Sequence, residues 1–275
     1  AGFRGTLLAA VSNASTGDGA GAVTWDFKVN DADLDDLAAN QNLVQVYTVT
    51  IDDGNGSTDS RDVTITITGT NDAPTLEASS MAAAEDGASV ALDLSVLGDD
   101  VDNDNDGNNL TYSVVSSSGG GTASVAGTTL SFDPGSDFQS LAVAETTEVE
   151  LEIQATDAHL ASAVNTVTVT VTGVNDDPTV NGVALNATED GGAVTASFAG
   201  DDVDSDDDGA SLIYTINGSP DTGSLVNNGD GTFTYDPGSN FQTLALGETV
   251  DYNLSYTGVD SHGAESASGA LAITV

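Results

Sequence analysis

The fold of this chain is decided by the stretch Gly69-Thr70-Asn71-Asp72-Ala73-Pro74, which returns 104 residues later as Gly173-Val174-Asn175-Asp176-Asp177-Pro178. Each copy follows a run in which apolar residues alternate with threonine, and a period of two is typical of a half-buried β-strand. The proline that closes each copy cannot donate to a strand ladder, and it holds the preceding residue in an extended conformation. Each copy therefore ends a strand with a short, rigid and acidic connector, after which a new module begins.

The rest of the chain repeats with nearly the same period. Glu85-Asp86-Gly87 returns as Glu189-Asp190-Gly191, and Phe132-Asp133-Pro134-Gly135-Ser136 returns as Tyr235-Asp236-Pro237-Gly238-Ser239. Such self-similarity is the signature of an array of equal modules, and about 100 residues is a usual domain size. The sequence therefore predicts three units, at residues 1–73, 74–177 and 178–275.

The second unit predicts an antiparallel β-sandwich. Turn signals separate short alternating segments, which we name strands A to G and expect at residues 75–78, 89–96, 110–115, 122–125, 129–132, 149–153 and 164–172. This spacing is typical of a two-sheet sandwich. Strand B should place Val90, Leu92, Leu94 and Val96 on one face, and strand F should turn its glutamates to solvent. The fold class is thus all-β, with tandem sandwiches in a linear array.

The first unit aligns with the second when residue 1 is set against Asp104. In this alignment strands A and B and the Glu-Asp-Gly turn of the first unit are absent. We expect that the sequence is a window from a longer array. Strand donation by a neighbouring molecule is the alternative.

The charge of the chain excludes several kinds of partner. Lys and Arg total 3 against 44 Asp and Glu, which gives a formal net charge of −41. Nucleic acids and anionic membranes require positive patches, so neither is an expected partner. No cysteine is present, so disulfides cannot staple the units, and metal ions are the remaining candidate. No apolar run is long enough for a membrane span, and residue 1 does not begin a signal peptide.

The segment Tyr47-Thr48-Val49-Thr50-Ile51-Asp52-Asp53-Gly54, with the strand ending in Gly-Thr-Asn-Asp-Ala-Pro, resembles the VCBS repeats of giant bacterial surface proteins. The second and third units are more similar to the bacterial cadherin-like variety. This resemblance implies immunoglobulin-like or cadherin-like sandwiches, calcium, and a secreted or surface-anchored adhesin. Asp177 stands where the motif usually has alanine. The glycine-rich calcium repeats of many such adhesins are absent.

The topology of a sandwich predicts which acidic turns meet. The B–C and F–G loops lie at the top of a unit, beside the incoming connector, and the A–B turn lies at the bottom, facing the next connector. Oxygen-rich clusters suit Ca²⁺, which accepts six to eight oxygen ligands in flexible geometry, whereas Mg²⁺ demands an octahedron. The candidate calcium ligands are Asp53, Asn71, Asp72, Glu85, Asp86, Asp100, Asp102, Asp104, Asp106, Asp157, Asn175, Asp176, Asp177, Glu189, Asp190, Asp202, Asp204, Asp206, Asp208 and Asp260.

The acidic clusters also fit two simpler interpretations, an EF-hand and a solvated loop. The B–C loops match the first half of an EF-hand, but position twelve is Ser113 or Thr215 instead of glutamate. Acidic runs are usually solvated loops, yet these clusters recur at matching positions that the topology brings together. We therefore predict calcium between the units.

No enzyme is predicted. His159 and His262 occupy one repeat position, where the first unit has Asn55, and are interpreted as turn residues. The sequence has no nucleophile elbow, His-rich zinc pattern or phosphate loop. Paired carboxylates suit a glycosidase, but small cores offer no deep pocket. The predicted function is a calcium-rigidified extender of a bacterial surface or biofilm-matrix adhesin, which contacts neighbouring repeats of its own polypeptide. The alternatives are a module that binds a glycan or a protein, and a self-assembling fibre subunit.

Overall fold

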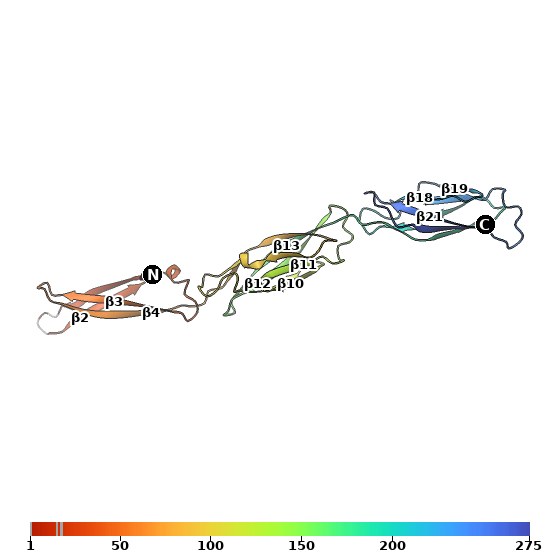
Figure 1. Cartoon of the computed structure of the whole chain (residues 1–275). Helices are drawn as coiled ribbons and strands as arrows, with labels where there is room; N and C mark the ends of the chain where they lie inside the picture. The colour runs from red at the N-terminus through yellow and green to blue at the C-terminus, as the bar shows by residue number, and fades with distance from the viewer. Residues whose placement is uncertain (1, 15, 17–18) are drawn as a thin grey trace.

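The structure, a computed structural model, describes residues 2–14, 16 and 19–275. Three units follow one another along a line: strands β1 to β4 form the first unit, β5 to β13 the second, and β14 to β22 the third (Figure 1). The described residues form strands, turns and two short 3-10 helices, η1 (Asp31–Asp33) and η2 (Leu94–Val96). The predicted all-β fold of tandem sandwiches in a linear array is confirmed.

The second unit packs a four-stranded sheet, in the order β6-β13-β12-β9, against a three-stranded sheet, β10-β11-β7. In β12, Val149, Leu151 and Ile153 are buried in the core, and the glutamates that alternate with them are exposed, as the sequence predicts. The strands are β5 (Thr75–Leu76), β6 (Ser79–Ala84), β7 (Val90–Asp93), β8 (Gly98–Asp99), β9 (Thr111–Ser117), β10 (Thr122–Ala126), β11 (Thr129–Asp133), β12 (Thr146–Thr156) and β13 (Ser162–Thr172).

The third unit repeats this arrangement with sheets β15-β22-β21-β18 and β16-β20-β19. In both units the first strand of the larger sheet runs parallel to the last, β6 beside β13 and β15 beside β22. This pairing carries the chain to the bottom of the unit, where its acidic turn follows. The strands are β14 (Thr179–Val180), β15 (Val183–Asn186), β16 (Val194–Ser197), β17 (Gly200–Asp201), β18 (Ile213–Asn217), β19 (Ser224–Asn227), β20 (Thr232–Asp236), β21 (Asp251–Val259) and β22 (Gly269–Thr274).

The predicted strand B of the second unit is wrong in its second half. β7 ends at Asp93, whose carboxylate accepts hydrogen bonds from the backbone amide and hydroxyl of Ser95. This cap starts η2, and the helical turn breaks the alternation of faces. Leu94 is therefore fully buried, whereas Val96 is 73% exposed instead of lying on the same face.

The predicted alignment of the first unit is also wrong. β1 (Thr6–Ala14) pairs with β2 (Gly21–Lys28) as a hairpin, and β3 (Asn42–Asp52) pairs with β4 (Thr58–Thr68). Gly5, with φ of +81°, lies beside Phe27 as Gly121, with φ of +78°, lies beside Phe132. β1 therefore corresponds to β10, and the described residues of this unit hold no counterpart of strand C. Leu37 and Ala38 are its buried apolar side chains among those described.

Candidate metal centre

The connector between the second and third units contributes one carboxylate to a cluster of three. Glu85 comes from the turn after β6, Asp176 from the connector and Asp204 from the loop after β17, and one oxygen of each lies within 4.8 Å of the others. Glu85 is fully buried and Asp204 is 3% exposed. Residues that are 119 positions apart in sequence are thus brought together by the bottom of one unit and the top of the next.

Hydrogen bonds hold this second junction, the one between the second and third units, in place. The amide of Val174 donates to Glu85 Oε1 over 2.7 Å, and the amide of Asp176 donates to Asp204 Oδ2 over 2.9 Å. Asn175 Nδ2 donates to Asp260 Oδ2 over 2.8 Å. The connector is therefore tied to the unit below through Glu85 and to the unit above through Asp204 and Asp260.

The electrostatics of the second junction favour a bound cation. Burial raises the pKa of Glu85, and the neighbouring Asp176, Asp204 and Asp86 carboxylates raise it further. Burial likewise raises the pKa of Asp176 and Asp202, and nearby carboxylates add to both shifts. Two ionised groups at this separation repel by roughly 3 kcal/mol at an effective dielectric of about 20. A divalent cation would turn this repulsion into attraction.

The oxygen atoms of the second junction fit a hard cation. Five buried oxygens there accept no hydrogen bond among the described residues: Glu85 Oε2, Asn175 Oδ1, Asp176 Oδ2, Asp202 Oδ2 and Asp204 Oδ1. A buried polar atom without a partner is costly, and almost all such atoms in folded proteins are satisfied. Five unsatisfied oxygens on adjoining segments form a donor set of the kind that Ca²⁺ prefers.

The first junction, between the first and second units, repeats the upper half of this arrangement. Asn71 Nδ2 donates to Asp157 Oδ2 over 2.8 Å, and the amide of Asp72 donates to Asp102 Oδ2 over 2.9 Å. Asn71 Oδ1, Asp100 Oδ2 and Asp102 Oδ1 are buried without a hydrogen-bond partner among the described residues. Burial raises the pKa of Asp100, and the charges of Asp102, Asp157 and Asp104 raise it too.

Two F–G carboxylates behave differently from the rest. Burial alone would raise the pKa of Asp157, but hydrogen bonds from Asn71 and from the amides of His159 and Ala161 outweigh it and leave the pKa lowered. Burial would likewise raise the pKa of Asp260. Hydrogen bonds from Asn175 and from the backbone amides of Ala264 and His262 outweigh this effect, so its pKa is also lowered. Both carboxylates therefore remain ionised at neutral pH.

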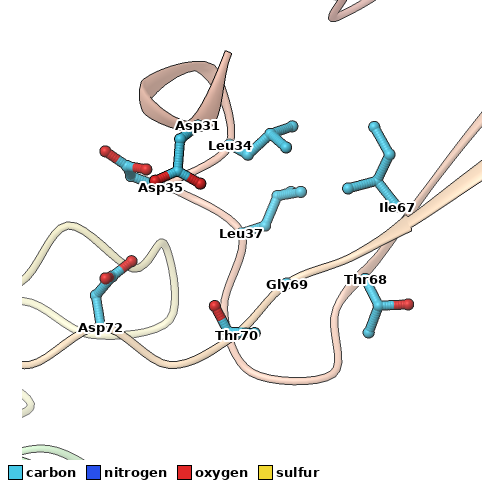
Figure 2. A pocket seen from close by; sticks show the side chains of 9 residues that line it. All are labelled: Asp31, Leu34, Asp35, Leu37, Ile67, Thr68, Gly69, Thr70 and Asp72. Carbon is cyan, nitrogen blue, oxygen red and sulfur yellow. The ribbon is translucent and has the colours of Figure 1, made fainter. Parts of the chain in front are cut away.

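The lower half of the first junction is an open pocket of ≈ 270 Å³ (Figure 2). Asp31 and Asp35 near η1 and Asp72 on the connector give it acidic walls, and Leu34 and Ile67 lie on its other side. Its lining includes Thr70 and Asp72, which occupy the repeat positions of Val174 and Asp176. These are the residues that surround Glu85 in the second junction, so the pocket lies where the first junction has no glutamate.

The other predicted ligands occupy several surroundings. Asp53 holds the turn between β3 and β4 through the amides of Asn55 and Ser57, which lower its pKa. Asp106 and Asp208 cap the ends of their B–C loops, where each accepts backbone amides. Asp86 and Asp190 accept hydrogen bonds from Gln139 and Gln242. Asp104 Oδ1 accepts a hydrogen bond from the side-chain Nδ2 of Asn105, and Asp177 is exposed beside Asp176. Glu189 Oε2 is buried without a hydrogen-bond partner among the described residues, and Asp206 faces His262.

Sequence reasoning missed two features of the site. Ser205 bonds across the second junction, from its amide to the Ser140 carbonyl and from its hydroxyl to Glu145, and Asn103 similarly reaches the Asp36 carbonyl at the first. Asp207 and His262, which were not predicted as ligands, lie with Asp206 in a second group of potential metal ligands. The doubled acids of the loop were visible in the sequence, but nothing local indicated that His262 would meet them.

Solved structures of animal cadherins share this fold. The EC22–24 fragment of mouse cadherin-23 superposes with a TM-score of 0.51 at 16% identity, covering 98% of this chain and 85% of that one. The EC1–3 fragment of mouse protocadherin-24 gives 0.50 at 16% identity, with 84% and 79% covered. Protocadherin gamma B7 domains 1–4 give 0.52 at 14% identity, with 100% and 65% covered. At these identities the likeness concerns the fold.

No curated protein matches the chain. Among the described residues, no helix has the length and apolar character that crossing a membrane requires. Two family models match adjoining segments: Bacterial Ig domain over residues 71–172 and Bacterial cadherin-like domain over residues 175–275. The boundary between the two matches falls at the second connector. The chain therefore carries adhesion-type Ig-like and cadherin-like domains in tandem, and the predicted resemblance to the cadherin-like repeats of bacterial adhesins is confirmed.

Proposed function

We propose that this chain is an extender segment of a bacterial surface or biofilm-matrix adhesin in which calcium makes the junctions between units rigid. The observation that carries the proposal is the contact of Glu85, Asp176 and Asp204, three carboxylates from the unit below, the connector and the unit above. Since the group is assembled from both units, a cation that binds it must cross-link them.

The mechanism is mechanical. Without a cation, repulsion between the carboxylates opposes close approach of the two units, and screening over about 8–10 Å at physiological salt relieves it in part. With calcium, Glu85, Asn175, Asp176, Asp202 and Asp204 would supply oxygen ligands, and the hinge would lose its freedom. Asn71, Asp100, Asp102 and Asp157 would serve the first junction. A string of small sandwiches would thereby become a stiff rod.

The wider assignment follows from the domain types. Ig-like and cadherin-like domains are typically structural or adhesive, so we assign the chain no catalytic role and an extracellular location. We propose unit boundaries at residues 73/74 and 177/178. Its immediate partners would be neighbouring repeats of the same polypeptide.

Small-angle X-ray scattering tests the proposal directly. We expect calcium-loaded protein to give the distance distribution of an extended rod, and calcium-free protein to give a shorter or broader one. Magnesium at the same concentration controls for screening and should restore little of the difference. Superimposable profiles with and without calcium would show that calcium does not rigidify these junctions.

A further inference from the structure

A second group of metal ligands, separate from the junction carboxylates, lies on the third unit. It consists of Asp206 and Asp207 from the B–C loop and His262 from the F–G loop, and one ligand atom of each lies within 4.8 Å of the others. His262 Nε2 is 3.8 Å from Asp206 Oδ2, and His262 Nδ1 is 3.9 Å from Asp207 Oδ2. The site joins two loops of one unit, whereas the junction site joins two units.

The chemistry of this group differs from that of a calcium site. Calcium takes oxygen ligands, whereas one imidazole with two carboxylates is a donor set for zinc and related first-row ions. Tetrahedral zinc with bonds of about 2.0–2.2 Å needs its ligand atoms about 3.3–3.5 Å apart. The separation of His262 Nε2 from Asp206 Oδ2 exceeds this by a few tenths of an ångström, and the Asp207 ligand atom lies within 4.8 Å of the other two. The partly exposed His262 side chain can move to close these gaps.

The hydrogen bonds around the histidine orient one ring nitrogen toward the acids. The Ser261 hydroxyl donates its single proton to the buried carboxylate of Asp207 over 2.7 Å. Ser261 Oγ is also 3.1 Å from His262 Nδ1, so Nδ1 carries the proton in that contact. The neutral ring then has its free lone pair on Nε2, which faces Asp206. Metal-binding histidines are usually held in this way, through the ring nitrogen that does not bind the metal.

Asp207 is the buried member of this group of three potential ligands. Its side chain is 1% exposed, and its two oxygens also accept the hydroxyls of Ser211 and Ser261. These neutral donors fix the carboxylate without neutralising its charge, so it stays an anionic ligand. Among the described residues, the nearest ring nitrogen to Asp207 is His262 Nδ1, 3.9 Å from Asp207 Oδ2.

The second unit offers a natural contrast. Its corresponding residues are Asp104, Asn105 and His159, and the Asn105 amide donates to Asp104 over 2.9 Å. One carboxylate is thus replaced by an amide, the other accepts that amide, and His159 is exposed. No group of three ligands forms around His159 in the described part of the chain.

We propose that Asp206, Asp207 and His262 form a zinc site on the third unit, which other first-row transition metal ions can also occupy. This inference does not depend on calcium at the junctions. The test is a titration of the whole chain with zinc chloride by calorimetry, in a buffer that does not chelate metals and with calcium kept at saturation. Cobalt(II) absorption, which is intense for tetrahedral coordination, provides a second readout.

Four proteins are compared: wild type, His262→Asn, Asp207→Asn and the matched control His159→Asn. We expect one zinc step in wild type and in His159→Asn, weakened at least tenfold in His262→Asn and Asp207→Asn. Asparagine occurs at both positions in the other units, at Asn55 and Asn105, and circular dichroism melts verify folding. The proposal is overturned if wild type in saturating calcium binds no zinc below about 1 mM, or if both histidine variants lose zinc equally. Calcium titrations of the same variants report on the junctions independently.

Discussion

The two junctions are built from the same upper half and differ in the lower half. Asn71 contacts Asp157 as Asn175 contacts Asp260, both over 2.8 Å. The second junction receives Glu85 from the unit below, whereas the first has an open pocket there (Figure 2). The connector and upper loops of a site thus belong to one unit and its glutamate to the unit before. Each junction is therefore complete only when the preceding unit supplies its acidic turn.

Glu85→Gln is expected to have the largest effect, because it removes one charge from the closest carboxylate group. The amide oxygen can still accept the Val174 amide, so the turn is preserved. Calcium-free protein should be more stable to unfolding by about 1–2 kcal/mol, a typical scale for a single substitution. The tightest calcium-binding step should weaken at least tenfold. Thermal melts and calcium calorimetry measure the two effects.

Glu189→Gln is the matched control for this substitution. Glu189 occupies the same repeat position, but no connector of the described chain contacts it. It should leave both calcium steps unchanged. Equal losses of calcium affinity in the two variants would mean that Glu85 acts only through overall charge.

Asp102→Asn should have a smaller effect, confined to the first junction. Asp102 is 1% exposed, and Oδ2 accepts the Asp72 amide while Oδ1 has no hydrogen-bond partner among described residues. Since the first junction lacks the buried glutamate that Glu85 supplies at the second, its calcium step should be the weaker one, and this substitution should weaken it further by about tenfold. The corresponding Asp204→Asn should instead weaken the tighter step. Loss of the same step in both variants would contradict the distinction between the junctions.

The fold was largely predictable because its signals are local and repeated. Alternation in β12 and β13 indicates their buried faces, and turn residues recur at matching positions. The convergence of Glu85 with the second connector could be derived from the order of strands, since the topology alone decides which turns share an end.

Other features depended on information that the alternating pattern does not carry. Asp93 and Ser95 start η2 through side-chain hydrogen bonds and turn Val96 outward, a short capping signal that strand periodicity obscured. A constant sequence offset fails in the first unit because the strands of its β1–β2 hairpin are longer than those of β10–β11. The meeting of His262 with Asp207 depends on side-chain rotamers across two loops, which spacing cannot specify.

The folding stability of calcium-free protein should depend modestly on pH, and it should fall as the pH rises from about 4 toward neutral. Burial raises the pKa of Glu85, Asp176 and Asp202, so the folded state binds their protons more tightly than the unfolded chain does. Their contribution to stability is therefore present near pH 4 and is lost as the pH rises through the raised folded values. The pKa values of Asp157 and Asp260 are lowered, so their contribution to stability is instead lost as the pH falls. That loss occurs below the ordinary pKa of an aspartate.

We therefore expect calcium-free protein to melt at a higher temperature at pH 5 than at pH 7. With calcium the order should reverse, because protons compete with the cation for the same oxygens. Melts in both states at the two pH values measure this. Parallel pH dependence with and without calcium would mean that the junction carboxylates do not bind it.

Neutralising the exposed glutamates of β12 should have the smallest effect on stability and calcium binding. This change tests whether calcium responds to the position of the carboxylates or only to the total charge of the chain. Glu148, Glu150 and Glu152 lie opposite Thr170, Thr168 and Thr166 on the solvent face. Changing all three to glutamine removes more charge than Glu85→Gln, yet exposed substitutions usually shift stability within about 0.5 kcal/mol each. If calcium acts at the junctions, both binding steps and the calcium-induced rise in melting temperature should be unchanged. If calcium only screens an acidic surface, the triple variant without calcium should be more stable than Glu85→Gln without calcium. Its melting temperature should then also rise less when calcium is added. The two variants, compared in one calcium titration, decide between a built site and a solvated acidic surface.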